Sequence, residues 1–97
     1  MSFSLRSKKK FVPEISRFYG IIIRMYYDDH NPPHFHALYG DDEAWVNINT
    51  LAVFSGNLPS RALGMVIEWA SMHQEELRNN WELARSQQKL ERISPLK

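Results

Sequence analysis

The sequence predicts an α+β protein: an antiparallel meander of four or five strands, with a C-terminal helical segment packed on one face of the sheet. Short runs of β-branched and aromatic residues, separated by Gly, Asp, Asn and Pro, fill the chain as far as residue 56. Beyond Pro59 the apolar residues change to helical spacing. With 97 residues, 43% of them hydrophobic, the chain can close one modest core, so we expect a single domain over residues 12–97.

Turn signals separate the expected strands. The extended stretch at 12–18 and the isoleucine-rich run at 21–27 are predicted to form a hairpin through Tyr19-Gly20. Prolines lack amide donors, so the segment 28–33, which contains two of them, is expected to be a stiff loop. Further strands are expected at residues 34–39 and 43–48, with a short last strand around residues 51–54.

The C-terminal third is predicted to be helical. Pro59 stands where the first turn of a helix tolerates proline. Apolar residues then recur every three or four positions, on one stripe formed by Leu63, Val66, Ala70, His73, Leu77, Trp81 and Ala84. One helix to about residue 87 would exceed the typical length of about 11–12 residues, so we expect a bend near His73 or at Asn79-Asn80. The tail at residues 90–95 is expected to add a short edge strand.

Charge and composition exclude several function classes. Residues 1–10 hold four of the 12 basic residues and none of the 11 acidic ones, so the rest of the chain is mildly acidic. We therefore expect residues 1–11 to form a flexible basic arm, and nucleic acid to bind directly only through this arm. The sequence has no cysteine and no apolar run of the roughly 20 residues that a membrane helix needs. These features favour a cytoplasmic protein without membrane contact.

Two histidines are expected to share one face of a strand. Side chains alternate along a strand, so His34 and His36 point the same way, with Cα atoms about 6.6 Å apart, while Phe35 and Ala37 point the other way. A register that places these two apolar side chains beside those of the next strand leaves the histidines on a polar strip with Asn47, opposite the helix-covered core.

This strip is a candidate site, formed by His30, His34, His36 and Asn47. His30, held by the proline loop, can fold back over the strip with the carboxylate of Asp28 or Asp29. Histidine and carboxylate ligands match zinc, manganese, iron or nickel, and three ligands with an open position are typical of a catalytic site. The predicted metal ligands are His30, His34, His36 and Asp28.

Two other interpretations of the histidine cluster stay open. The imidazoles can simply lock the loop onto Tyr26, Tyr27 and Trp45, or they can form a metal-free catalytic or ligand site.

Other polar and aromatic residues are expected to lie outside the site. His73 falls within the apolar helix stripe and is predicted to be a core histidine. Residues 41–43 are interpreted as a solvated turn, and Trp69 and Trp81 as core or interface residues. The chain has no glycine-rich phosphate loop and no nucleophile elbow, so nucleotide-dependent chemistry has no support.

Five segments of the chain carry a resemblance to a known family: Ser-Arg-Phe-Tyr-Gly-Ile at 16–21, Tyr-Tyr-Asp-Asp-His-Asn-Pro-Pro-His-Phe-His-Ala at 26–37, Leu-Pro-Ser-Arg-Ala-Leu at 58–63, Glu-Trp-Ala at 68–70 and Asn-Trp-Glu-Leu-Ala at 80–84. Over about residues 12–96 the sequence resembles the bacterial family catalogued as domain of unknown function 4160. The resemblance implies a small bacterial protein, often encoded beside another short protein in pairs that look like toxin–antitoxin modules. It supplies no catalytic residue. Family members usually begin near the equivalent of Pro13, so residues 1–11 depart from the pattern.

Two hypotheses about function follow. The first is an interaction module in a two-gene, toxin–antitoxin-like system, whose partner is a small cognate protein encoded by a neighbouring gene. The second is a metal-dependent enzyme, in particular a hydrolase, that uses the three histidines of the candidate site. A homodimer is also expected, because twofold dimers are the commonest assembly.

Overall fold

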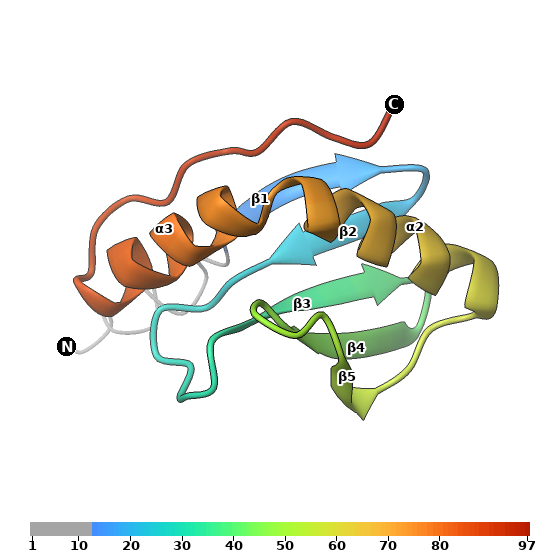
Figure 1. Ribbon diagram of the computed structural model, residues 1–97, viewed down its shortest axis with the longest axis horizontal. Helices are drawn as coiled ribbons and strands as arrows, with labels where there is room; N and C mark the ends of the chain where they lie inside the picture. Colours follow the sequence, from blue (N-terminus) through green and yellow to red (C-terminus); the bar gives the residue numbers. More distant parts are fainter. Residues whose placement is uncertain (1–12) are drawn as a thin grey trace, which may run out of the picture.

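The structure is a computed structural model that describes residues 13–97, and the basic arm expected at residues 1–11 lies outside them. Five antiparallel strands form one sheet in sequence order, and two helices follow (Figure 1). The elements are β1 (Glu14–Phe18), β2 (Ile21–Arg24), β3 (His34–Tyr39), β4 (Asp42–Asn47), β5 (Val53–Gly56), α2 (Ser60–Met72) and α3 (Gln74–Arg85). The predicted meander with C-terminal helices is confirmed.

Two tight turns set the pairing of the first four strands. Phe18 pairs with Ile21 across Tyr19 and Gly20, whose φ angles of 49° and 82° suit a two-residue hairpin turn. Tyr39 pairs with Asp42 across a turn with Gly40 at φ 59°. These turns fix the register of β2 on β1 next to the hairpin and that of β4 on β3.

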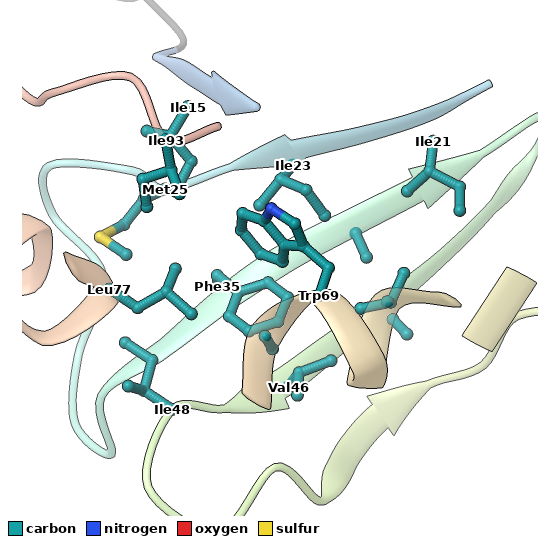
Figure 2. Close-up of a cluster of buried hydrophobic side chains, with 14 of the residues drawn as sticks. Ile15, Ile21, Ile23, Met25, Phe35, Val46, Ile48, Trp69, Leu77 and Ile93 are labelled. Atoms are coloured by element: carbon teal, nitrogen blue, oxygen red, sulfur yellow. The ribbon is translucent and has the colours of Figure 1, made fainter. Parts of the chain in front are cut away.

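The core lies between one face of the sheet and the helices. Phe35 pairs with Val46, and both side chains are fully buried on this face. Trp69 of α2 packs its ring edge-on against Phe35, with ring centroids 5.8 Å apart (Figure 2). The other large, fully buried apolar side chains of this core are Ile15, Ile21, Ile23, Met25, Ile48, Val66 and Leu77. Burying side chains of this size stabilises the fold by about 1.5–3 kcal/mol each before entropy is subtracted.

The helical segment is interrupted at His73, one of the two positions predicted for a bend. His73 has φ −130° and ψ 25°, which ends α2 and starts α3, and its backbone N–H donates to the carbonyl of Ala70 at 3.0 Å. Trp69 and Trp81 are both buried, as expected of core residues.

The tail beside β1 differs from the expected edge strand. Ile93 donates its backbone N–H to the carbonyl of Ile15, and Ser16 donates its hydroxyl to the carbonyl of Ile93. No strand is assigned over residues 90–97, and Pro95 has no N–H with which to extend a ladder. The tail is therefore docked by isolated bonds, including one from the indole of Trp69 to the carbonyl of Ser94 at 2.8 Å.

The last strand begins two residues later than predicted. Asn47 accepts hydrogen bonds from the backbone N–H groups of Asn49 and Thr50, and Leu51 follows at φ 63°. This side-chain turn uses residues that the sequence pattern assigned to the strand.

Within residues 13–97, neither helix has the length and apolar character that crossing a membrane requires.

Candidate metal centre

Two histidines are buried on the sheet face opposite Phe35. His34 lies across from Asn47 and His36 across from Trp45, so the predicted register is confirmed. The strip is polar, as expected, but it is not open to solvent, because each histidine is only 3% exposed. The reason is a cover of aromatic side chains over both rings.

Aromatic packing fixes the orientation of the imidazoles. The ring of His34 stacks on Trp45, with centroids 5.3 Å apart and an interplanar angle of 13°. Phe54 and Trp81 contact the same ring at 5.2 and 5.4 Å, and Tyr26 meets His36 edge-on at 4.4 Å. Rings enclosed in this way cannot rotate freely, so their nitrogens point in fixed directions.

The Nδ1 atoms of both rings face hydrogen-bond acceptors. His34 Nδ1 donates to the carbonyl oxygen of Pro32 at 2.7 Å, and His36 Nδ1 donates to Oε2 of Glu43 at 2.8 Å. A carbonyl and an ionised carboxylate only accept, so each Nδ1 carries a proton. In the neutral rings, the lone pair therefore resides on Nε2.

Glu43 is kept ionised by its surroundings. Partial burial acts to raise its pKa, but hydrogen bonds from His36 and Trp45, together with the charges of His36 and Arg24, outweigh this effect and hold the pKa of Glu43 below its ordinary value. The Trp45 indole donates to the same Oε2 at 3.0 Å.

Both Nε2 atoms converge on one carboxylate oxygen. Asp29 Oδ2 lies 2.9 Å from Nε2 of His36 and 3.4 Å from Nε2 of His34. A proton on His36 can satisfy the shorter contact, which would leave an imidazolium between two carboxylates. That proton does not satisfy His34, because its Nε2 atom is buried and no donor forms a hydrogen bond to it.

The arrangement fits a metal ion. Atoms bonded to one ion at about 2.0–2.2 Å stand about 2.8–3.1 Å apart in octahedral geometry and about 3.3–3.6 Å apart in tetrahedral geometry, so about 2.8–3.6 Å in all. The two distances to Asp29 lie in this range, and the three ligand atoms all lie within 4.8 Å of one another. Metal-binding histidines also usually donate their other N–H to a carboxylate or carbonyl, as Glu43 and Pro32 accept here.

The structure brings together some of the predicted site residues and leaves others apart. His34 and His36 meet Asp29, the carboxylate named beside Asp28 in the sequence, whereas His30 and Asp28 are exposed and lie outside this group. Asn47 shapes the turn before β5 and is not in the group either.

Glu43 is a functional candidate that sequence reasoning missed. The sequence predicts that Glu43 belongs to a solvated turn, and the structure contradicts this, because Glu43 lies in β4 and is hydrogen-bonded to His36. The signal was the period of two in β4, which places Glu43 on the same face as Trp45, the partner of His36. His73 lies outside the site, as expected, but it is half-buried at the helix junction, with Nδ1 2.5 Å from Oε1 of Glu76.

Comparison with known proteins identifies one family. The family model described as "Domain of unknown function (DUF4160)" matches residues 20–82, which include both strands of the histidine site and α2. Searches of curated proteins and of solved structures gave no significant match.

Proposed function

The chain belongs to the family described as a domain of unknown function (DUF4160), and we propose that it binds one divalent transition-metal ion through Asp29, His34 and His36. These three residues are called the metal centre below. The proposed centre keeps the histidine pair of the sequence hypothesis and takes Asp29 as its carboxylate.

One observation carries this proposal: the buried Nε2 atom of His34 has no donor and faces a carboxylate oxygen. Burying an acceptor without a partner costs about 1–3 kcal/mol, and an anionic oxygen at 3.4 Å adds repulsion between lone pairs. A cation between the three atoms removes both costs at once. The aromatic cover favours this site further, because charges attract more strongly in a partly buried site than in open water.

The donor set narrows the choice of metal and of chemistry. Two imidazole nitrogens and one carboxylate oxygen suit zinc, manganese, iron or nickel better than calcium or magnesium. An ion with three protein ligands keeps open positions for water or a substrate oxygen, as catalytic sites do. We therefore propose a metal-dependent enzyme, in particular a hydrolase, because hydrolysis needs no co-reactant besides water.

Calorimetric titration of chelator-treated protein with zinc tests the metal centre. We expect one ion per chain for the wild type and no binding for H34A and H36A. Binding should be unchanged for H30A, which removes the exposed histidine next to Asp29 in the loop before β3. Wild-type protein that binds no zinc, or H30A that loses binding as fully as H34A, contradicts the proposal.

A second candidate is the interaction module, which one surface feature favours. Strand β5 is last in the sheet order, and its Phe54 side chain is 45% exposed. A strand at the edge of a sheet can pair with a strand of another protein. Co-expression with the neighbouring gene product should give a complex that survives mild salt, and a complex lost in mild salt counts against this function.

A further inference from the structure

Arg24 lies next to the metal centre on the same sheet face. Its Cα pairs directly with that of His36 across β2 and β3. Side chains of directly opposed residues share a face, with Cβ atoms about 4.5–5.5 Å apart. The Arg24 side chain therefore starts beside the ring of His36 and is half-buried there.

The guanidinium of Arg24 lacks a complete set of partners. Its Nε–H is buried and has no acceptor. All 11 acidic residues of the chain fall within residues 13–97, and among these residues no carboxylate forms an ion pair with Arg24. Glu14, which pairs with Arg24 on the other side of β2, is engaged by Arg17 and Arg92 instead.

The charges around the metal centre add up to a net positive charge when a divalent ion is bound. A divalent ion with Asp29 carries a net charge of +1, and the negative charge of Glu43 offsets the positive charge of Arg24. Arg24 is near enough to act on a ligand of the ion, because it is paired directly with His36 across β2 and β3. A partly buried site with a net positive charge and open metal positions favours a negatively charged ligand.

We propose that the metal centre and Arg24 together bind an oxyanion, the phosphate or carboxylate group of a small substrate. Oxygen atoms of the group fill open positions on the ion while the guanidinium donates to another oxygen. The planar fork of arginine matches both groups, and its charge-assisted hydrogen bonds are among the strongest in proteins. This inference rests on the proposed metal centre and names its substrate class.

The aromatic cover indicates what surrounds the oxyanion. Tyr26 and Trp45 are half-buried, and Phe54 is exposed at the same face. These rings offer apolar surface to the rest of a substrate while the charged group points at the ion.

The test uses the full chain loaded with Co²⁺, whose visible absorption changes when a ligand joins the ion. Titration with inorganic phosphate, and separately with acetate, is expected to shift the spectrum of the wild type. R24Q should weaken binding by about tenfold or more, since a hydrogen bond to a charged group contributes about 1.5–3 kcal/mol. R61Q, which changes an exposed arginine of α2, should bind like the wild type. The stronger of the two anions identifies the class of group.

Different failures have different meanings. Wild-type protein that takes up no Co²⁺ overturns the proposed function itself. Protein that takes up Co²⁺ but binds phosphate and acetate equally well as R24Q and as wild type overturns only the role of Arg24, which then serves Glu43 alone.

A second measurement avoids substitution, in case R24Q does not fold. Phenylglyoxal modifies accessible arginines, and modified residues are mapped by mass spectrometry. In Co²⁺-loaded wild type, saturating phosphate or acetate should reduce modification of Arg24 several-fold and leave that of Arg61 unchanged. Equal modification of Arg24 with and without either anion overturns the inference.

Discussion

Glu43 Oε2 lies 2.8 Å from Nδ1 of His36, on the side of the ring opposite Asp29. This contact fixes which nitrogen carries the proton and so keeps Nε2 available to a metal. Partners of this kind typically contribute 10–100-fold to metal affinity. We expect E43Q to raise the zinc dissociation constant by about 10-fold or more, because a neutral amide holds the Nδ1 proton less strongly.

The matched control for Glu43 is D42N, which removes the exposed carboxylate one residue earlier in the same strand. Competition with a chromophoric chelator measures both dissociation constants. If E43Q and D42N bind zinc equally well, Glu43 does not support the metal centre.

Gly56 gives a way to disturb Glu43 through the backbone. It has φ 71°, and a Cβ built on it would lie 2.1 Å from the carbonyl oxygen of Glu43. G56A should therefore push the two strands apart, with a loss of about 1–3 kcal/mol in unfolding free energy from strain and displaced packing. Zinc affinity should fall with it.

Gly64 provides the comparison for G56A in urea denaturation. It lies within α2 with nothing within 4 Å of an added Cβ. G64A should stabilise the protein by about 0.5–1 kcal/mol, since alanine favours a helix over glycine. A neutral G56A would show that the strands accommodate the methyl group.

Much of the fold was predictable because local rules were sufficient for it. The register of β3 on β4 follows from alternation, since a slip of one residue would exchange His36 and Phe35 between the faces. Helix length predicts a break in the helical segment, and the structure places it at His73, one of the two expected positions.

The site was only half predictable, because part of it depends on the path of a loop. His34 and His36 share a face by alternation alone, whereas the choice between Asp28 and Asp29 depends on how residues 28–33 turn. The hydrogen bond between Glu43 and His36 joins side chains on two different strands. The period of two places both residues on one face, but it does not predict which side chain accepts the proton of His36 Nδ1. The expectation of a partner encoded nearby stays a prediction.

Asn80 is a buried polar residue whose role only the structure reveals. Its side chain donates to the carbonyl of Glu91 and accepts from the backbone N–H of the same residue, both at 2.9 Å. These two bonds tie the tail to α3. N80A should lower the unfolding free energy by about 2–3 kcal/mol, because it leaves the backbone N–H and carbonyl of Glu91 without their hydrogen-bond partner.

The neighbouring N79A removes an exposed amide from the same helix and should change stability by less than about 0.5 kcal/mol. Chemical denaturation of both variants makes the comparison, and limited proteolysis should cut the tail of N80A faster. Equal stability of the two variants would mean that water replaces the amide of Asn80.

Glu14 links β1 to the tail in a way that depends on pH. The hydrogen bond from Arg17, reinforced by one from Arg92, lowers the pKa of Glu14 from 4.5 to about 2 against the opposing effect of burial. A depressed carboxyl pKa contributes stability above the unfolded value that is lost as pH falls through the folded value. The contribution is therefore complete above about pH 5, shrinks below pH 4.5 and is gone below about pH 2.

E14Q should lower the unfolding free energy by less than about 1 kcal/mol at pH 7, since these ion pairs are near the surface. The difference from wild type should vanish by about pH 2, as followed by thermal unfolding across pH. E68Q changes an exposed carboxylate that forms no ion pair among residues 13–97, and should show no such trend. A constant difference between E14Q and wild type down to pH 2 contradicts this account.

Metal binding should be visible as thermal stability. A ligand that binds only the folded chain at 100 times its dissociation constant adds about 2.7 kcal/mol. For a domain of this size each kcal/mol corresponds to about 4–8 °C in Tm, so saturating zinc should raise the Tm by roughly 10–20 °C. Chelator should reverse the rise, H30A should retain it and D29N should lose most of it. D29N keeps the shape of the carboxylate and so separates loss of charge from loss of packing. A Tm that zinc leaves unchanged in the wild type means that the three converging atoms are satisfied by protons alone.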